Sequence, residues 1–571
     1  MLVATALTWA VPASAQATME RVPDRLPGEG EGPFPTLLIR GATVIDGTGA
    51  PPMRPVDIEV SGNRIAALHP GGAPAAVIAK AQRTIDAGGM YVLPGFVDVH
   101  GHNGDPSKAP QPSYGYKLWL AHGVTTVRGV SFYFGPGDDL TDAARSRANT
   151  IVAPRLVPYA VFGDKWSLGE PDTPDKARAW VRWAAAQGYD GVKFFNGESP
   201  AVFAAALDEA KKVKLGTVAH LKQEGVAEIN AARAAELGLG GVTHFYGLFE
   251  SLLDGRSIPE YPADFNYFDE QDRFAWVARI ADQAVAPGSA KWDAFVGDLV
   301  EQKVTLSPTF NIYVASRDVM RARTLEWHDN YTLPSLWAFY QPSLTNHGSY
   351  YHDWTSETEV AWKGFYAKWF DLTRDFKNRG GRVTVGSDPG YIYQTWGFAY
   401  VAELEMLREA GLSPLEVIRA ATIDGAREIY DPKGFEPPMG SIKPGKLADL
   451  VIVPENPLAN LKVLYGTGFQ RLNRTSNTVE TVGGVRWTVK DGVVYDAPAL
   501  LADVARMVAE ARAACNRRPR ARLRATPPAT RGRASWRSPR SSAGKASACN
   551  RAAAGCFPVS TSTSARATGL R

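Results

Sequence analysis

The sequence predicts an α/β protein in which a (β/α)8 TIM barrel carries a small β-sandwich built from both chain flanks. Eight short apolar runs alternate with Ala-rich helical patterns in the middle of the 571 residues, as is typical of βα units in series. Strand-turn-strand patterns with Asp-Gly, Gly-Gly and Gly-Asn turns lie on either side of this region, which is typical of short β-hairpins. One barrel needs about 200–250 residues, so the length permits one large domain with smaller parts attached.

Composition excludes several classes of protein. The apolar share of 45% and the charged share of 21% are ordinary for a globular chain, so fibrous and wholly disordered classes are excluded. The net charge of +4 combines two unlike parts, because residues 512–571 contain fourteen Lys or Arg and no acidic residue, which leaves −10 for residues 1–511. All three cysteines lie in that last part: Cys515, Cys549 and Cys556. The remainder therefore has no disulfide, no cysteine nucleophile and no Cys-ligated metal.

The first seventeen residues predict a signal peptide. They are apolar and then small, and both Ala13-Ser14-Ala15 and Ala15-Gln16-Ala17 fit the A-x-A cleavage pattern. The usual basic segment is missing, since the first basic residue is Arg21, so a disordered apolar N-terminus is the alternative. The apolar run is too short to span a membrane. We expect an exported protein, periplasmic or secreted, without membrane insertion.

The last segment, residues 512–571, predicts a disordered basic tail. It is rich in Arg, Ala, Ser and Pro without amphipathic periodicity, and such a composition cannot bury enough surface to offset chain entropy. A basic run can bind nucleic acid, but interleaved aromatic residues are few here, Trp536 and Phe557. The abrupt loss of acidic residues resembles a GC-rich gene read out of frame, which is the interpretation we prefer. No nucleic-acid partner is expected, and a homo-oligomer remains open.

Eight apolar runs supply the predicted barrel strands. In chain order they are residues 95–102, 123–131, 155–163, 188–195, 214–221, 240–247, 303–310 and 382–390. Residues 175–188 and 224–238 have the periodicity of crossover helices. After the eighth strand, Ser413 and Glu416 form a capping box with Pro at the first helical position, which predicts a further helix. The barrel is expected to span residues 95–436.

Two further regions complete the predicted organisation. The flanks, residues 36–94 and 439–496, are expected to pair into one composite β-sandwich beside the barrel. Between strands seven and eight, an insertion of about residues 311–375 is dense in Trp and Tyr. A loop of that length at the C-terminal face of a barrel is usually functional, so we interpret it as a lid. An extra helical packing layer is the alternative.

Metal-compatible side chains recur near the ends of the predicted strands. Along the first strand, His100 and His102 share the parity of Phe96 and Asp98, so both histidines enter the barrel mouth, while Asp98 lies deeper as a structural hydrogen-bonding group. Two imidazoles on one strand suit a divalent ion. Four more groups lie at or near the last inward position of strands four, five, six and eight: Lys193, His220, His244 and Asp388. A buried lysine is costly unless its charge is removed or paired.

Three motifs give the sequence a family resemblance: LPGFVDVHGH (93–102), GVTTVRG (123–129) and GSIKPGKLADLVIV (440–453). Together with the lysine, histidines and aspartate just named, they make residues 36–496 resemble the metal-dependent amidohydrolase superfamily. Within it the chain resembles the imidazolonepropionase-like group, which includes Xaa-Pro dipeptidases and ochratoxin-hydrolysing amidohydrolases. The resemblance implies two divalent metal ions, with zinc as the default, and a lysine carboxylated by CO2.

The resemblance also assigns a role to each of the six groups. His100, His102 and Asp388 would bind the more buried ion, His220 and His244 the more exposed one, and carboxylated Lys193 would bridge the two. Two such ions lower the pKa of a shared water and polarise the scissile carbonyl. Asp388 would take the proton from the attacking hydroxide and pass it to the leaving nitrogen.

Four further residues are candidates for contacts with substrate. Arg128 ends strand two and is placed to bind a carboxylate bidentately, with an internal ion pair as the alternative. Tyr246, two residues after His244, is placed to hydrogen-bond a tetrahedral oxyanion and is the second catalytic candidate. Tyr313 and Tyr391 follow strands seven and eight and are expected to line the pocket. Plain packing is the alternative for all three tyrosines.

These assignments predict an enzyme that hydrolyses an amide or cyclic-amide C–N bond in a small-molecule substrate, such as a dipeptide or an N-acyl amino acid. A lactonase, esterase or phosphoesterase on the same two metals stays open, because the same hydroxide attacks any such centre. A deaminase is disfavoured, since deaminases of this superfamily typically replace the lysine and place a Glu shortly after the strand-five His, where this chain has Gln223 and then Glu224. A non-catalytic binding protein would have lost ligands, and none is lost.

Overall fold

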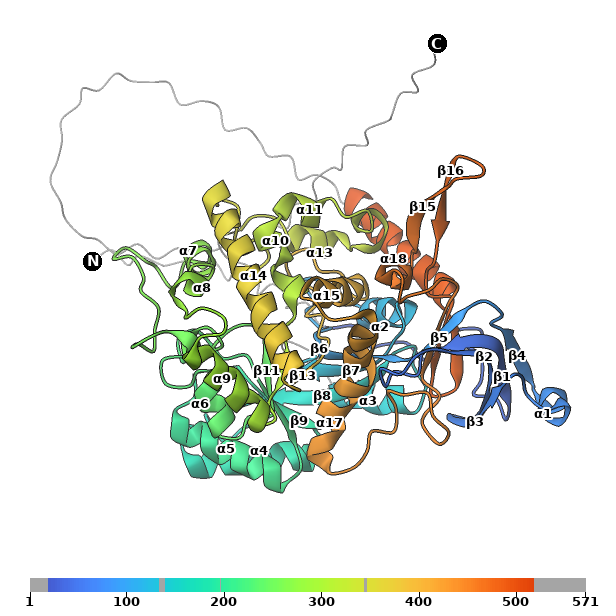
Figure 1. Cartoon of the computed structure of the whole chain (residues 1–571), viewed down its shortest axis with the longest axis horizontal. Coiled ribbons are helices and arrows are strands. Elements are labelled where there is room, and N and C mark those ends of the chain that lie inside the picture. Colours follow the sequence, from blue (N-terminus) through green and yellow to red (C-terminus); the bar gives the residue numbers. More distant parts are fainter. Residues whose placement is uncertain (1–18, 133–138, 196, 344–346, 518–571) are drawn as a thin grey trace, which may run out of the picture.

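The computed structural model describes residues 19–132, 139–195, 197–343 and 347–517. Its centre is a barrel of eight parallel strands that lie in the sheet in chain order (Figure 1). The strands are β6 (Phe96–Gly101), β7 (Val124–Val130), β8 (Arg155–Val161), β9 (Gly191–Phe194), β10 (Gly216–Ala219), β11 (Gly241–Thr243), β12 (Thr305–Ser307) and β13 (Arg382–Val383). All eight predicted strands are confirmed, each within the apolar run that predicted it.

The first and last barrel strands meet, so the sheet closes on itself. Val99 N donates a hydrogen bond to Val385 O, and Asp388 N donates one to His100 O, each at 2.9 Å. The backbone that follows the short strand β13 thus continues the closure. The C-terminal ends of all eight strands therefore surround one mouth, which is where parallel barrels carry their reactive side chains.

Helices connect the strands and cover the outside of the barrel. In chain order they are α2 (Pro112–Ala121), α3 (Asp139–Arg147), α4 (Pro174–Gln187), α5 (Pro200–Lys212), α6 (Ala231–Glu236), α7 (Glu270–Val277), α8 (Ile280–Gln283) and α9 (Ala290–Glu301). Helix α4 confirms its prediction, with Thr173 as N-cap and Gly188 as a left-handed C-cap. The helix predicted at 224–238 is shorter than expected, because Asn230 caps α6 and the residues before it form turns.

The helices after β13 complete the barrel. They are α15 (Phe398–Glu409), α16 (Pro414–Arg419) and α17 (Gly425–Tyr430), with a π-helical stretch at Ala420–Asp424 between the last two. The predicted capping box is present at the start of α16, since Ser413 N donates to the Glu416 carboxylate at 2.7 Å and the Ser413 hydroxyl accepts from Glu416 N. This pair thereby satisfies two backbone N–H groups at the N-terminus of α16, those of Ser413 and Glu416.

The two flanks pair with each other, as predicted, through β5 and β14. Their strands are β1 (Leu37–Val44), β2 (Met53–Ser61), β3 (Arg64–Pro70), β4 (Arg83–Asp86), β5 (Tyr91–Pro94), β14 (Leu450–Val453), β17 (Trp487–Lys490) and β18 (Val493–Asp496). Hydrogen bonds join all of them into one eight-stranded sheet instead of two separate sheets. Register shifts in β1 between Ile39 and Val44 increase local twist, and the sheet encloses a small core of its own that includes Ile58, Leu450 and Val489.

The insertion between β12 and β13 is mainly helical. It contains α10 (Val314–Arg317), α11 (Val319–Arg323), α12 (His328–Tyr331), α13 (Pro334–Phe339) and the long α14 (Ser356–Asn378). His328 is buried there, bonded to Thr332 and to the carbonyl of Ala322, so this part is the helical packing layer. Farther along, the ring of His347 lies 5.8 Å from that of Tyr391, which brings residues 347–351 to the mouth. A lid role for that stretch stays a prediction.

Helix α18 (Ala497–Arg517) corrects the boundary of the predicted tail. Residues 512–517 belong to this helix, and Arg512 donates to the carbonyl of His328 at 3.2 Å. The helix packs on α2, where Lys117 is paired with Asp503. The rest of the predicted tail and the predicted signal peptide, residues 1–17, lie outside the described residues.

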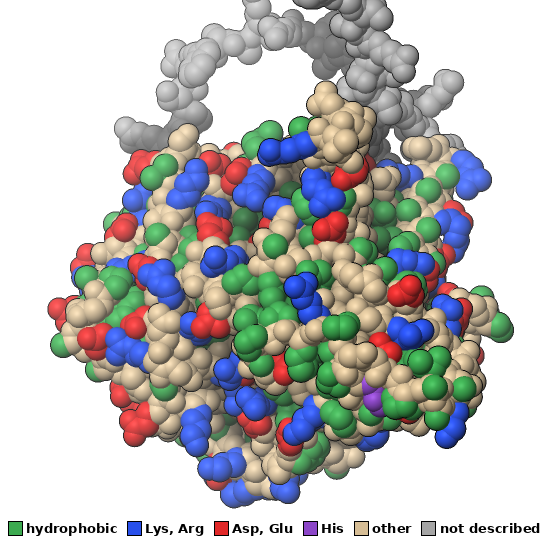
Figure 2. Space-filling model, turned by 45° about the vertical axis from the view of Figure 1, so that its right-hand side comes forward, with side chains coloured by type: hydrophobic (Ala, Val, Ile, Leu, Met, Phe, Trp, Pro, Cys, Tyr) green, Lys and Arg blue, Asp and Glu red, His purple; other side chains and the backbone are tan. Residues whose placement is uncertain are grey.

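On the face of the molecule that Figure 2 shows, basic and acidic side chains are interspersed and do not gather into a patch of one charge. Such mixing produces no strong net field for steering a polyanion. Of the helices that the structure describes, none combines the length and the apolar character that crossing a membrane requires.

Candidate metal centre

The six predicted metal-compatible side chains gather at the C-terminal end of the barrel. His100 is the penultimate residue of β6, and His102 directly follows the strand. The others lie in β9, directly after β10 and β11, and in the segment after β13: Lys193, His220, His244 and Asp388. Parity along one strand and position at the strand ends were therefore sufficient to place them in one mouth.

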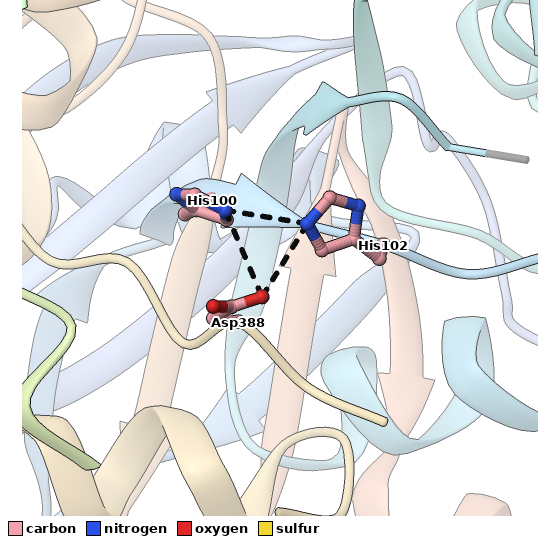
Figure 3. A group of neighbouring side chains, drawn as sticks. All are labelled: His100, His102 and Asp388. Atoms are coloured by element: carbon pink, nitrogen blue, oxygen red, sulfur yellow. Dashed lines mark hydrogen bonds and ion pairs between the residues drawn. The ribbon is translucent and has the colours of Figure 1, made fainter. Parts of the chain in front are cut away.

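The tightest group consists of His100, His102 and Asp388 (Figure 3). His102 Nε2 lies 3.2 Å from His100 Nε2 and 3.3 Å from Asp388 Oδ1, and His100 Nε2 lies 3.7 Å from that oxygen. Two imidazole nitrogens and a carboxylate oxygen are typical ligands of zinc. Within the described part of the chain, this triad is the one group of three or more such residues whose ligand atoms are close enough to share an ion.

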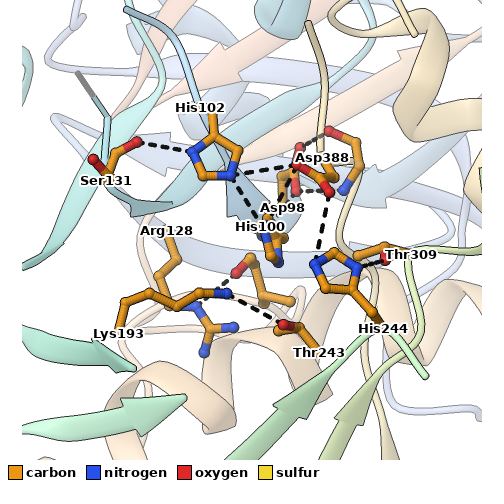
Figure 4. A network of polar contacts seen from close by, with 12 residues as sticks. Asp98, His100, His102, Arg128, Ser131, Lys193, Thr243, His244, Thr309 and Asp388 are labelled. Atoms are coloured by element: carbon orange, nitrogen blue, oxygen red, sulfur yellow. Dashed lines mark hydrogen bonds and ion pairs between the residues drawn. The ribbon is translucent and has the colours of Figure 1, made fainter. Parts of the chain in front are cut away.

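Hydrogen bonds at the back of two rings assign their tautomers (Figure 4). His102 Nδ1 lies 2.9 Å from the carbonyl oxygen of Ser131, which can only accept, so Nδ1 carries the proton. His244 Nδ1 lies 2.5 Å from Thr309 Oγ1, whose own proton goes to the carbonyl of Pro308, so Nδ1 donates there as well. In the neutral rings, both Nε2 atoms therefore present lone pairs to the mouth.

These lone pairs face a carboxylate that is also only an acceptor. Asp388 Oδ1 is 3.3 Å from His102 Nε2, and Asp388 Oδ2 is 3.8 Å from His244 Nε2. Acceptors that converge without a proton between them repel one another, and a cation at their centre removes that repulsion. The donor set therefore fits a divalent metal ion.

Burial keeps the histidines in the form that binds metals. The pKa values of His100, His220 and His244 are all well below the ordinary value, mainly because the rings are desolvated and also because charges such as that of Lys193 lie nearby. A neutral imidazole has a free lone pair for a metal, whereas an imidazolium has none.

Lys193 and His220 form the other side of the site. Lys193 Nζ donates to Thr243 Oγ1 at 3.2 Å, and burial lowers the pKa of Lys193 to about 7, while Asp388 partly raises it. The ring of His220 lies 4.8 Å from that of His244 and stacks on Tyr246 at 4.3 Å. A lysine that readily loses its proton is chemically suited to react with CO2, because only the neutral amine is nucleophilic.

Two of the site residues have a left-handed backbone. The φ angles are 65° at His244 and 42° at Asp388, a conformation that costs about 1–3 kcal/mol for a residue with a side chain. At Asp388 the hydrogen bond from its N–H to the carbonyl of His100 holds that conformation. The strained backbone thus turns the carboxylate toward the two histidines of β6.

Asp98 has the structural role predicted for it. One carboxylate oxygen accepts from His100 N at 3.1 Å and from Ser387 N at 3.0 Å, and the other accepts from Trp119 Nε1 at 3.0 Å. Burial raises the pKa of Asp98 to about 6. Asp98 therefore ties β6 to the residue that precedes Asp388 and fixes the spacing of the triad.

Arg128 requires a correction, because the structure does not place it against substrate. Its guanidinium is buried, with Nη1 2.6 Å from Glu428 Oε1 and Nε 2.6 Å from the carbonyl oxygen of Val99. It also lies over the ring of Tyr159 at 5.1 Å. A buried guanidinium paired with Glu428 inside the barrel is the internal ion pair that was the alternative.

The three tyrosines do lie around the mouth. Tyr313 donates to the hydroxyl oxygen of Tyr246 at 3.2 Å, so the proton of Tyr246 remains available for another acceptor. Burial raises the pKa of Tyr246, which keeps that proton in place at neutral pH. The ring of Tyr391 lies 6.2 Å from that of His102.

Lys108 is a mouth residue that the sequence did not indicate. It belongs to the segment between β6 and α2, and its Nζ lies 3.5 Å from the centre of the Tyr391 ring. Its position follows no strand parity, and its neighbours Tyr391 and Phe339 are more than two hundred residues away in sequence. Only folding brings them together.

Comparison with known proteins gives two kinds of likeness. Residues 368–494 match the amidohydrolase family. An N-acyl-D-glutamate deacylase of Alcaligenes xylosoxydans xylosoxydans is 42% identical over 91 residues, 16% of this chain and 17% of that protein. An adenine deaminase of Serratia proteamaculans is 35% identical over 98 residues, 17% of this chain and 15% of that protein. The chain thus spans about a sixth of the length of these curated relatives.

Solved structures match over most of the chain. A Xaa-Pro dipeptidase with bound methionine in its active site is 18% identical, with a TM-score of 0.53 over 81% of this chain and 100% of that one. The ochratoxinase of A. niger is 16% identical, with a TM-score of 0.52 over 81% and 95%. At this identity the likeness shows the fold, and the fold is the barrel predicted from the sequence. Residues 368–494 are therefore similar to the amidohydrolase family, and the fold of most of the chain is the one that the Xaa-Pro dipeptidase and ochratoxinase structures have.

Proposed function

We propose that this protein is a binuclear metal-dependent hydrolase that cleaves an amide or cyclic-amide C–N bond in a small molecule such as a dipeptide or an N-acyl amino acid. The observation that carries the proposal is that the lone pairs of His102 and His244 face the two oxygens of Asp388, at 3.3 Å from Oδ1 and 3.8 Å from Oδ2. The amidohydrolase match over residues 368–494 and the deacylase likeness support hydrolysis of an amide.

The proposed site would hold two ions. His100, His102 and Asp388 would hold one, His220 and His244 would hold the other, and Lys193, carboxylated by CO2, would lie between them. Bound divalent ions, with zinc as the default, would polarise the scissile carbonyl and make water more acidic. The neutral histidines and the low pKa of Lys193 support this assignment.

The chain's own groups would then move the proton and hold the developing charge. The Asp388 carboxylate is placed to accept a proton from the attacking water and to return it to the leaving nitrogen. The Tyr246 hydroxyl, which accepts from Tyr313, is placed to donate its own proton in a hydrogen bond to the oxyanion. Both side chains are buried in the mouth, away from bulk water, which strengthens their electrostatic interactions with the substrate.

Two alternatives use the same site. Esters, lactones or phosphoesters present a comparable electrophilic centre, so an esterase, lactonase or phosphoesterase is the second candidate. A deaminase has the support of the adenine deaminase likeness over a sixth of that protein. Against it, the Glu224 side chain is 42% exposed and is engaged by Lys222 at 3.2 Å.

A hydrolysis screen with metal analysis tests the proposal. Purified protein would be offered dipeptides including Xaa-Pro, N-acyl derivatives of L- and D-amino acids, adenine, lactones and phosphoesters. We expect amide hydrolysis with about two zinc equivalents per chain, lost on chelation and restored by zinc. Activity confined to adenine or to the phosphoesters would overturn the proposal.

We also propose that the protein is exported, on the strength of the predicted signal peptide at residues 1–17. Fractionation of expressing cells, followed by N-terminal sequencing of the protein outside the cytoplasm, tests this. A mature N-terminus directly after Ala15 or Ala17 is expected, and an intact Met1 in every fraction would contradict it.

A further inference from the structure

Lys108 is a buried cation at the barrel mouth that the proposed chemistry does not use. Its side chain is 5% exposed and lies against two aromatic faces, with Nζ 3.5 Å from the ring centre of Tyr391 and 4.1 Å from that of Phe339. Such cation–π contacts stabilise a desolvated ammonium. Burial lowers the pKa of Lys108 to about 8, although Asp105 and Asp388 both raise it. The group is therefore largely charged at neutral pH.

Tyr391 connects this cation to the candidate metal centre. Its ring stands nearly perpendicular to that of His102, with the centres 6.2 Å apart, and it follows Asp388 by three residues. Tyr391 is thus a neighbour of both Lys108 and His102. A ligand held at Lys108 would extend toward the triad.

The ammonium of Lys108 is weakly paired for a buried charge. Asp105 Oδ2 lies 3.6 Å from Nζ, which is longer than a hydrogen bond. The other oxygen of Asp105 is engaged by the N–H and hydroxyl of Ser107, and the Asp105 side chain is 28% exposed. An incoming carboxylate could take the place next to Nζ that Asp105 only approaches.

Two other buried cations outside the candidate metal centre are paired more closely. Lys117, also buried, lies on α2 at 2.9 Å from Glu29 and is also paired with Asp503. Arg128 lies 2.6 Å from Glu428. Burying a cation without a close carboxylate is energetically unfavourable. At Lys108 an anionic group of a ligand would offset this energy.

We propose that Lys108, seated on Tyr391 and Phe339, binds the free carboxylate of the substrate. The substrate class is then an amide whose amino-acid part carries an unmodified carboxylate, and the residue replaces Arg128 as the carboxylate-binding group. This inference rests on the proposed function, because it names the substrate of the same site.

Matched substrates test it without any mutation. The best substrate of the hydrolysis screen is compared with its carboxamide, which differs only in the lost negative charge. We expect the wild-type kcat/KM to favour the carboxylate at least tenfold. Equal values for the pair would overturn the role of Lys108 while leaving amide hydrolysis intact, and failure to cleave either compound would instead overturn the proposed function.

Variants of Lys108 separate binding from packing. Lys108→Met keeps the apolar stem on the rings, so we expect KM for the carboxylate to rise at least tenfold, with KM for the carboxamide and both kcat values little changed. Lys108→Arg is expected to restore part of the preference. Lys117→Met, which removes another buried ammonium away from the mouth, is the control and keeps the full preference. Equal losses on both substrates in Lys108→Met would show that Lys108 only positions Tyr391, which contradicts the inference.

Discussion

His102 Nε2 and Asp388 Oδ1 face each other across 3.3 Å while His102 Nδ1 is occupied by the carbonyl of Ser131. A lone pair therefore faces a carboxylate at hydrogen-bond distance with no proton to share in the neutral ring. This arrangement is stable only when a cation or an added proton lies between the two groups. In the proposed mechanism Asp388 is therefore both a candidate ligand and the proton acceptor.

Asp388→Asn tests the second of these roles. The amide keeps a ligand oxygen but cannot accept a proton, so we expect kcat to fall by about 10²–10⁴-fold. Steady-state kinetics, with circular dichroism to verify folding, measures this. The control is Glu224→Gln, which neutralises an exposed carboxylate paired with Lys222 and is expected to leave kcat unchanged. A fully active Asp388→Asn enzyme would refute the assignment.

Removal of the metal and loss of Lys193 should have separable effects. Chelation is expected to abolish activity and to lower Tm, since bound ions stabilise the folded state by about 2.7 kcal/mol at a hundred times Kd. Lys193→Ala removes the proposed bridge, so the zinc content should fall from two ions per chain toward one. Plasma emission spectroscopy and thermal unfolding give both readouts. Unchanged zinc content in Lys193→Ala would contradict a bridging lysine.

Arg128→Met should damage stability and not substrate affinity. The change leaves Glu428 buried without its partner at 2.6 Å, and breaking a buried ion pair in this way costs about 3–5 kcal/mol. We expect a lower Tm with KM unchanged. Adding Glu428→Gln removes the lone charge and should recover part of the loss. A large rise in KM without a fall in Tm would contradict this and indicate that Arg128 binds the substrate.

The burial of His328 predicts that the protein becomes less stable as the pH falls. Burial lowers its pKa from 6.5 to about 4, so the unfolded chain binds a proton at higher pH than the folded chain does. Stability therefore falls as pH falls from about 6.5 to about 4, by up to about 3 kcal/mol. His328→Asn should make this dependence shallower in urea unfolding measured across the window, while the other buried histidines keep part of the slope. The control, His352→Asn at the surface, keeps the wild-type slope, and an unchanged slope in His328→Asn would disprove the prediction.

Two truncations test where the folded chain ends. A chain that stops at Arg517 keeps α18 and should retain wild-type Tm and activity. A chain that stops at Asp496 loses the helix and with it the pairing of Lys117 with Asp503 and the packing on α2, so we expect a clearly lower Tm. Inactivity of the longer, folded truncation would show that residues beyond 517 have a function.

The barrel and its rim were predictable because they depend on local patterns. The alternation of apolar runs with helical periods identified all eight strands, and the parity of residues 96–102 placed His100 and His102 at the mouth. The single curled sheet was not predictable from the flanks. Whether strands join one sheet or two depends on pairings such as that of Ile452 with Val92, which lie hundreds of residues apart.

The sequence by itself determined the barrel, the order of its strands and the residue types at their C-terminal ends. Only the tertiary structure decided which partners the other buried charged side chains, such as Arg128 and Lys108, have. Arg128 forms an ion pair with Glu428, three hundred residues away in sequence. Lys108 instead lies on the ring of Tyr391, and its carboxylate partner Asp105 is 3.6 Å away. The reason is that strand and helix patterns are properties of neighbouring residues, but the pairing of a buried charge depends on which distant side chain the fold brings beside it.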